Sequence, residues 1–253
     1  MASVFPPIIY RDLLIVPNDQ DGDSSIVALD KMTGKIRWQV PRKGKTSFAT
    51  PCVFQGANGP DQLILTNWIP GITSLDPKTG KVFWESDVFY KKHTETSIGS
   101  PIVAGDLVLG SAGWLSVNYE IIAVRAVPTS RSKPGQKVYT INRSAPLVLT
   151  PLAKDDLLFI WTDTGIVSCA DVQTGKIHWR ERVGGSYYGS PVWVDGRLYC
   201  VSRDGMVVVL SASKKFSLLA KNRLPEGSHA TPAIAGGRMY LRTFGHLISV
   251  GGE

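Results

Sequence analysis

The chain has 253 residues, of which 43% are hydrophobic and 19% are charged, as in a folded globular chain rather than a disordered one. The net charge of +7 comes from basic residues that do not form one stripe, so we expect no nucleic-acid partner. No apolar run reaches the length of a transmembrane helix, and the opening residues, Met-Ala-Ser-Val-Phe-Pro-Pro, lack the basic and apolar regions of a secretory signal.

A repeated motif occurs at residues 28–38, 74–84 and 169–179, and it reads small, apolar, Asp, any, any, Thr, Gly, Lys, apolar, any, Trp. Between the copies, Ser or Thr followed by Pro recurs at Thr50-Pro51, Ser100-Pro101, Thr150-Pro151, Ser190-Pro191 and Thr231-Pro232, and Pro6-Pro7 opens the chain in the same context. The spacing of these markers, about 40 to 50 residues, is typical of a four-stranded propeller blade.

Each repeat unit predicts the same short strands. In the fourth unit, strands over 157–161 and 166–170 flank the turn 163–165, and in the fifth the hairpin Asp195-Gly196 joins strands over 192–194 and 197–201. No segment shows helical periodicity. We therefore predict an all-β chain, a β-propeller of four-stranded antiparallel blades forming one domain over 1–253, with units near 7–45, 46–90, 95–141, 145–183, 186–224 and 228–253.

The sixth unit ends after its third predicted strand, 246–250. We therefore expect five full blades and one three-stranded blade. Either six blades close tightly, or the chain is part of a longer propeller with seven or eight blades. Uncovered sheet ends would favour association with other molecules.

The motif residues have a structural interpretation. The aspartates accept hydrogen bonds from turn amides, the glycines supply positive φ, and the tryptophans of the outermost strand wedge between blades and donate through their N–H. These residues are Asp30, Gly34, Trp38, Asp76, Gly80, Trp84, Asp171, Gly175 and Trp179. After an insertion at 128–135, Tyr139 replaces the tryptophan in the third unit, and Leu218 or Leu219 takes its packing role in the fifth.

The Thr-Gly-Lys-x-x-Trp units resemble the PQQ-type repeat, the propeller repeat of quinoprotein dehydrogenases and of BamB-like proteins. The resemblance covers the whole chain and implies a scaffold that binds a protein or peptide, in the periplasm or outside the cell. It also implies an N-terminal truncation that removes a signal sequence and one or two blades. The repeat is specific for fold and weak for function.

Catalysis is the alternative implied by the same resemblance. A PQQ-dependent oxidoreductase of this family carries Ca²⁺ ligands, a catalytic Asp, a stacking Trp and often adjacent cysteines. Here Cys52, Cys169 and Cys200 are far apart in sequence, and the c-type haem motif Cys-x-x-Cys-His is missing. We therefore expect no catalytic residue and no cofactor, with PQQ and calcium only under this alternative.

One acidic loop has metal-ligand spacing. Asp19, Asp21 and Asp23 alternate like the first ligands of an EF-hand, but Ser24 stands where that loop needs glycine. A hydrophilic hairpin loop explains the same residues, so we expect no metal site and keep the three aspartates as the weak candidate. The three cysteines are expected to be free thiols in strands.

The loops at the ends of the predicted strands are where a propeller binds its ligand. Aromatic and arginine side chains there would suit a peptide, an extended strand or a sugar, although such aromatics also serve as core between blades. The candidates are Tyr187, Tyr188, His229, Trp161, Arg203 and Arg242. A glycine-rich stretch around Tyr187 and Tyr188 favours their exposure. A glycan-binding propeller is the remaining alternative.

Overall fold

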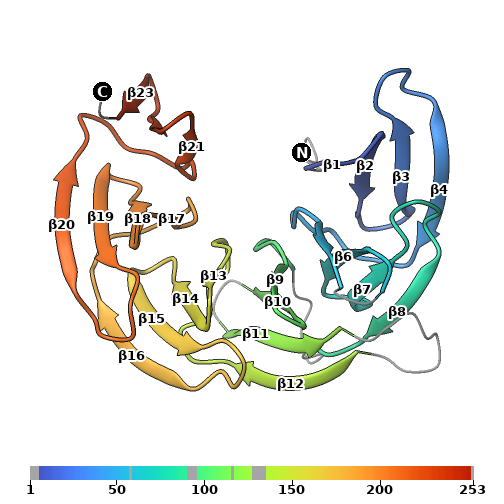
Figure 1. The fold of residues 1–253 in the computed structure, drawn as a ribbon, viewed down its shortest axis with the longest axis horizontal. Helices are drawn as coiled ribbons and strands as arrows, with labels where there is room; N and C mark the ends of the chain where they lie inside the picture. The colour runs from blue at the N-terminus through green and yellow to red at the C-terminus, as the bar shows by residue number, and fades with distance from the viewer. Residues whose placement is uncertain (1–5, 57–58, 90–95, 115–116, 127–134, 252–253) are drawn as a thin grey trace. The chain divides into compact units, whose positions relative to one another are not determined.

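All regular secondary structure in the described part of the chain is β-strand. The computed structural model describes residues 6–56, 59–89, 96–114, 117–126 and 135–251. Its strands form antiparallel meanders in which each strand pairs with the next along the chain (Figure 1). These residues contain no helix long and apolar enough to cross a membrane. The predicted all-β class and four-stranded blades are confirmed.

The chain divides into two compact units, residues 1–143 and 144–253, and each holds three sheets. The sheets of the first unit are β1 (Ile8–Tyr10), β2 (Leu13–Asn18), β3 (Ser24–Asp30) and β4 (Ile36–Arg42); β5 (Cys52–Phe54), β6 (Gln62–Asn67), β7 (Gly71–Leu75) and β8 (Val82–Ser86); and β9 (Ile102–Ala104), β10 (Leu107–Trp114), β11 (Val117–Arg125) and β12 (Gln136–Ile141). The single domain expected over 1–253 stays a prediction.

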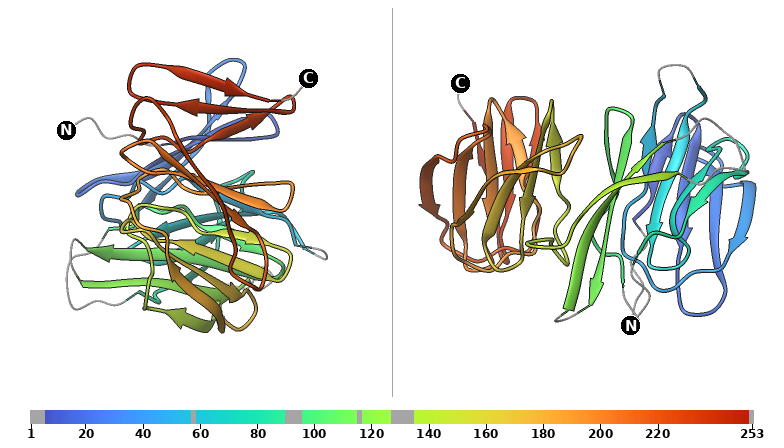
Figure 2. Two further views of the ribbon diagram at one scale, coloured as in Figure 1. Left: turned by 90° about the vertical axis from the view of Figure 1, so that its left-hand side faces the viewer. Right: turned by 90° about the horizontal axis from the view of Figure 1, so that it is seen from below.

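The second unit repeats the arrangement with one strand fewer in its last sheet. It holds β13 (Leu152–Lys154), β14 (Leu157–Trp161), β15 (Ile166–Asp171) and β16 (Ile177–Arg182); β17 (Val192–Val194), β18 (Arg197–Val201), β19 (Met206–Ser211) and β20 (Leu218–Arg223); and β21 (Ala233–Ala235), β22 (Arg238–Arg242) and β23 (Leu247–Val250). Figure 2 shows the twist within the individual sheets, as expected for L-amino acids. The six predicted units match these six sheets in order.

The repeated motif forms the same turn in each copy. The Asp30 carboxylate accepts from the amides of Met32 and Thr33, at 3.1 and 2.9 Å, and the Asp171 carboxylate accepts in the same way from residues 173 and 174. Gly34, Gly80 and Gly175 have φ near +70°. The predicted roles of the aspartates and glycines are therefore confirmed.

The Ser/Thr-Pro markers link neighbouring sheets. The Thr50 amide donates to the Ser100 hydroxyl at 3.0 Å, and the Thr150 amide donates to the Ser190 hydroxyl at 2.9 Å. The Ser190 amide donates in turn to Thr231 Oγ1, also at 2.9 Å. In these three markers the hydroxyl before the proline therefore accepts from the backbone at the preceding marker, which explains the preference for Ser or Thr there.

Two of the three motif tryptophans join adjacent sheets through their N–H. Trp38 donates to the carbonyl of Pro77 at 3.2 Å, and Trp179 donates to the carbonyl of Ser213 at 3.0 Å. Trp84 differs, because it donates to Gln62 Oε1 of its own sheet at 2.9 Å, while its buried ring packs toward the third sheet. The wedge role is therefore confirmed, and the partner of the N–H varies.

Strand register identifies what replaces tryptophan in the other sheets. Ala28 pairs with Trp38 and Ala123 pairs with Tyr139, each next to a bulge, so Tyr139 occupies the tryptophan position as predicted. In the fifth sheet the same position is Ala220, which pairs with Val209. The prediction of Leu218 or Leu219 is wrong, because both are exposed while Ala220 packs against the core. Most of the insertion at 128–135 lies outside the described residues.

Candidate functional site

The fifth and sixth sheets bring four exposed side chains into one group. Three of them were predicted as binding residues and one was not. Tyr188 lies in the loop before β17, Arg203 in the turn after β18, His229 in the loop before β21 and Phe244 in the turn after β22. We call these four residues the Tyr188 cluster. All belong to the second compact unit.

Ring and guanidinium contacts join the Tyr188 cluster. The Arg203 guanidinium carbon lies 4.5 Å from the centre of the Tyr188 ring, and the His229 ring centre lies 4.9 Å from that of Tyr188. His229 also meets Phe244 edge to face at 5.0 Å. Arg203 Nε donates to His229 Nε2 at 3.2 Å, so the proton of a neutral imidazole would lie on Nδ1.

The backbone around Gly227 positions two of these side chains. The Arg203 amide donates to the carbonyl of Ser186 at 2.7 Å, and the Phe244 amide donates to the carbonyl of Gly227 at 3.1 Å. A Cβ on Gly227 would lie 2.2 Å from the Arg203 carbonyl oxygen and 2.7 Å from the Phe244 ring. Glycine is therefore required here by close approach.

The Tyr188 cluster has the chemistry of a recognition surface. Phe244 is 66% exposed and Tyr188 is 41% exposed, while Arg203 offers charge and N–H donors beside them. Such aromatic and arginine groups dominate binding energy at protein interfaces. No Ser or Cys nucleophile takes part in the contacts described for these four residues.

Three of the six predicted binding residues do not join this group. Tyr187 and Trp161 are buried in the core between the fourth and fifth sheets, with ring centres 5.3 Å apart. The expected exposure of Tyr187 is wrong, because neighbouring residues of an extended segment face opposite ways and Tyr187 takes the inward side. Arg242 is exposed on β22, and its carbonyl accepts from Ser228 Oγ at 2.6 Å.

Sequence reasoning missed Phe244, although the repeats contain the necessary signal. In each of the last two sheets, a backbone amide donates across the turn that follows the second strand. The Ser202 amide donates to the carbonyl of Met206, and the Thr243 amide donates to the carbonyl of His246. Aligning these two turns places Phe244 at the position of Arg203. The prediction of Arg203 could therefore have been extended to Phe244, which holds the same position in the next unit.

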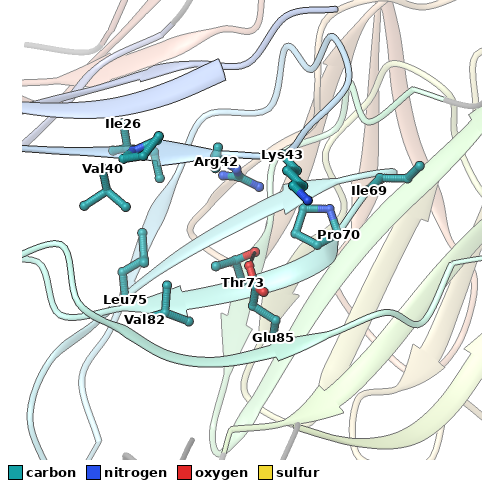
Figure 3. A pocket seen from close by; sticks show the side chains of 11 residues that line it. Ile26, Val40, Arg42, Lys43, Ile69, Pro70, Thr73, Leu75, Val82 and Glu85 are labelled. Atoms are coloured by element: carbon teal, nitrogen blue, oxygen red, sulfur yellow. Dashed lines mark hydrogen bonds between the residues drawn. The ribbon is translucent and has the colours of Figure 1, made fainter. Parts of the chain in front are cut away.

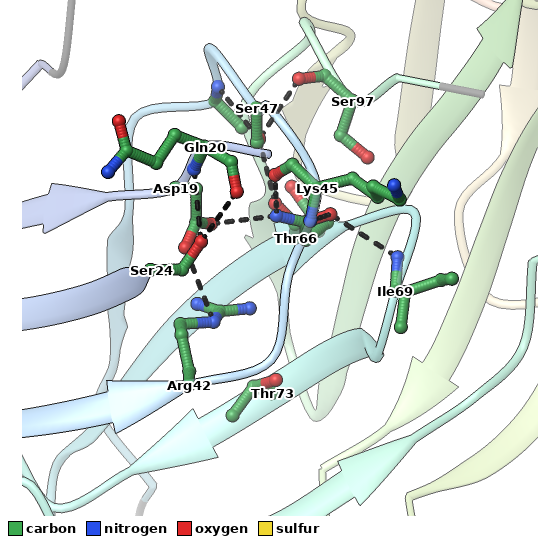
Figure 4. Close-up of polar contacts among 12 residues, drawn as sticks. Asp19, Gln20, Ser24, Arg42, Lys45, Ser47, Thr66, Ile69, Thr73 and Ser97 are labelled. Carbon is green, nitrogen blue, oxygen red and sulfur yellow. Dashed lines mark hydrogen bonds and ion pairs between the residues drawn. The ribbon is translucent and has the colours of Figure 1, made fainter. Parts of the chain in front are cut away.

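The acidic loop does not gather its carboxylates. Asp19 is buried beside Arg42, with Oδ1 3.3 Å from Nε, and its Oδ2 accepts from Asn67 Nδ2 at 2.9 Å (Figure 4). Asp21 instead faces Lys45 at 3.6 Å, and Asp23 is exposed. Among the described residues, no three His, Cys, Asp or Glu side chains lie together as metal ligands.

Arg42 lies at an unpredicted pocket in the first unit. A pocket of about 380 Å³ separates β3 and β4 from β7 and β8, and Arg42 and Lys43 face Thr73 and Glu85 across it (Figure 3). Its remaining walls are Ile26, Val40, Pro41, Ile69, Pro70, Leu75 and Val82. Burial lowers the pKa of the Arg42 guanidinium, and the charges of Asp19 and Glu85 act against this effect.

The alternation along β4 could have revealed Arg42. Trp38, Val40 and Arg42 are the half-buried positions of this strand, while Arg37, Gln39 and Pro41 are exposed. Counting by two from the motif tryptophan places Arg42 on the inward face. Arg42 was instead grouped with the neighbouring lysines as part of a solvated basic surface, so its inward orientation was not predicted.

Comparison with solved structures supports the blade architecture. BamB from Moraxella catarrhalis superposes with a TM-score of 0.69 at 18% identity, covering 99% of this chain and 70% of that one. Quinohemoprotein alcohol dehydrogenase from Comamonas testosteroni gives a TM-score of 0.68 at 13% identity, covering 93% of this chain and 50% of that one. These likenesses show the fold.

Sequence comparison identifies the family. Tetrathionate hydrolase from Acidithiobacillus ferrooxidans is 29% identical in an alignment of 128 residues that covers 44% of this chain and 25% of that protein. This chain thus matches only a quarter of the length of that curated relative. A family model described as outer membrane protein assembly factor BamB matches residues 2–147 and again residues 131–251. The chain belongs to the BamB-like family of PQQ-type propeller repeats.

Proposed function

We propose that this chain is a non-catalytic scaffold that binds a protein or peptide partner through the Tyr188 cluster. The exposed, ordered stack of Arg203, Tyr188, His229 and Phe244 carries the proposal. Its rings offer apolar area that is already held in place, so binding would cost little side-chain entropy. The guanidinium adds a charged donor that favours acidic or carbonyl-rich segments.

The family match suggests a cellular location and a process for this scaffold. The matching model describes a factor for outer membrane protein assembly. We propose that the chain works in the periplasm or outside the cell and contacts proteins of such an assembly. The supporting observations are the family match and the exposed recognition surface, and the partner itself is open.

Site-specific crosslinking tests the scaffold proposal. A photoreactive phenylalanine analogue replaces Phe244 in one variant and Trp193 in the control, since Trp193 is also an exposed aromatic with a nearby cation, Lys154. In cells of the source organism, we expect discrete adducts from position 244 that disappear when Arg203→Ala is added. Equal adducts from both positions, or none from position 244, would contradict the proposal.

The alternative is a PQQ-dependent oxidoreductase, favoured by the fold likeness to quinohemoprotein alcohol dehydrogenase. Against it stands the observation that, among the described residues, no three acidic, His or Cys side chains lie together as candidate Ca²⁺ ligands. A titration with PQQ and Ca²⁺, followed by the fluorescence of the seven tryptophans, separates the two functions. Saturable quenching would favour the oxidoreductase, and saturable quenching by neutral sugars alone would favour a glycan-binding propeller.

A further inference from the structure

The pocket beside Arg42 has the build of a small-molecule site. Its volume of about 380 Å³ lies at the lower end of the range for ligand pockets. Ile26, Leu75 and Thr73 form a buried floor, while Lys43 and Glu85 are exposed at the rim. Figure 3 shows aliphatic side chains on both sides of the facing charges. A ligand could therefore enter from solvent and bury an apolar body.

Arg42 brings unused hydrogen-bond donors to this pocket. Its side chain is only 7% exposed, and Nε, Nη1 and Nη2 are buried without a hydrogen-bond partner among the described residues. Asp19 supplies a charge 3.3 Å from Nε but does not reach hydrogen-bond geometry. Buried polar groups are normally satisfied, and an unsatisfied buried guanidinium is costly. The donors therefore lack an acceptor, and because each nitrogen is itself shielded from solvent, a ligand in the pocket would reach them only after a small movement of the Arg42 side chain.

The surrounding charges select the acceptor. A guanidinium fork matches the two oxygens of a carboxylate. Glu85 lies close enough to raise the pKa of Arg42, so it would repel a second negative charge on a ligand. A dianion such as a phosphate monoester would also pay a larger desolvation penalty between aliphatic walls. A single negative charge on an apolar body fits both constraints.

We propose that the Arg42 pocket binds a small monocarboxylate with an apolar chain, whose carboxylate pairs with the Arg42 guanidinium. The apolar chain lies along Val40, Leu75 and Val82. This site is independent of the Tyr188 cluster, because its residues belong to the other compact unit. Its ligand could be a free medium-chain fatty acid or an N-acylated apolar amino acid, which present the same carboxylate chemistry.

Calorimetric titration of the full chain tests the site with four probes: octanoate, N-acetyl-leucine, octanol and octyl phosphate. We expect saturable binding of octanoate or N-acetyl-leucine. Tighter binding of octanoate would indicate a fatty acid as the ligand, and tighter binding of N-acetyl-leucine would indicate an amino-acid carboxylate. Octanol and octyl phosphate should bind at least about tenfold more weakly. Equal binding of octanol and octanoate, or no binding of either carboxylate, would overturn the proposal.

Variants locate the binding. Arg42→Met should abolish carboxylate binding, and Glu85→Gln should tighten it by about two- to fivefold because the repelling charge is gone. Val82→Phe should narrow the pocket, and Val82 is not part of the Asp19–Arg42 ion pair, so this variant keeps the test valid if Arg42→Met fails to fold. Binding that survives Val82→Phe in a folded protein would place the ligand elsewhere and refute the site.

Discussion

The turn aspartates show how a single residue carries the repeat. Asp30 and Asp171 each accept two amides and a threonine hydroxyl within their turns. These bonds stabilise the carboxylate over the carboxylic acid. The amide and hydroxyl of Thr33 therefore lower the pKa of Asp30, and the hydroxyl and amide of Thr174 lower that of Asp171.

A pH dependence of stability follows from these aspartates. The pKa values of these aspartates are lower in the folded state than in the unfolded state. Their contribution to the free energy of unfolding is therefore fully present above the unfolded-state pKa, about 3.9, and is lost as the pH falls through the folded-state pKa. We expect urea midpoints to fall below about pH 4, and the fall to be shallower in Asp171→Asn. Asp195→Asn, in an exposed hairpin turn, is the control. An unchanged pH profile in Asp171→Asn would show that this turn does not contribute.

The cysteines give a second prediction at this scale. All three are free thiols, and burial raises the pKa of Cys52 and of Cys169 to about 12 and raises that of Cys200 well above its ordinary value. The reactive thiolate is therefore scarce, and we expect labelling at pH 8 to be about a thousandfold slower than for an ordinary cysteine. A thiol reagent should modify all three only in denaturant. Fast labelling of the native chain would show that a strand opens readily.

Strands and their connections explain why the pocket escaped the sequence. Its walls come from two neighbouring sheets, and of its lining residues only Leu75 and Val82 belong to the repeated motif. The motif turns and the Tyr139 position follow from local spacing, so they could be predicted. The exposure of Leu218 and Leu219 could not, because it depends on register, and a bulge beside Ala220 decides which residue faces the core.

The buried ion pair between β4 and the loop after β2 is testable by a double-mutant cycle. Asp19 and Arg42 are 4% and 7% exposed, so removing either one leaves an unpaired buried charge. We expect Asp19→Asn and Arg42→Met each to lower the free energy of unfolding by about 3 kcal/mol, and the double variant to lose less than their sum. Urea unfolding measures all three.

The exposed pair of Arg223 and Asp204 supplies the control for that cycle. Both side chains are more than half exposed, although their charged atoms lie 3.3 Å apart. Solvent screening makes such pairs weak, so Arg223→Met should leave the urea midpoint nearly unchanged. Additive losses in the Asp19 and Arg42 variants would mean that the two charges do not stabilise each other.

At the scale of the molecule, the repeat fixes architecture and leaves function open. The period recurs along the chain, and the turn chemistry and tryptophan spacing recur in three of the six units. Together they determine the blade, and a fold of this kind does not determine a function. We therefore expect the features that differ between units to carry the functional information. Phe244 beside Arg203 and the inward Arg42 are such differences, and the structure places each of them against residues of a neighbouring sheet.

The sixth sheet leads to a prediction about association. β23 pairs with β22, and no other described strand pairs with its second edge. Leu247 on this strand is 69% exposed, and Val250 is 52% exposed. An apolar strand with free backbone groups is a template for pairing with another chain. We expect the weight-average mass to rise with protein concentration in sedimentation equilibrium.

A substitution on β23 distinguishes association through this strand edge from nonspecific hydrophobic association. Leu247→Lys places a charge on the strand, which natural proteins use to block pairing, and it should hold the chain monomeric at concentrations where the unmodified chain associates. Met32→Lys is the matched control, because Met32 is 84% exposed but lies in a turn. If both variants associate like the parent, the contact lies elsewhere. If only Leu247→Lys stays monomeric, the free edge of the sixth sheet is the surface through which copies of this chain meet.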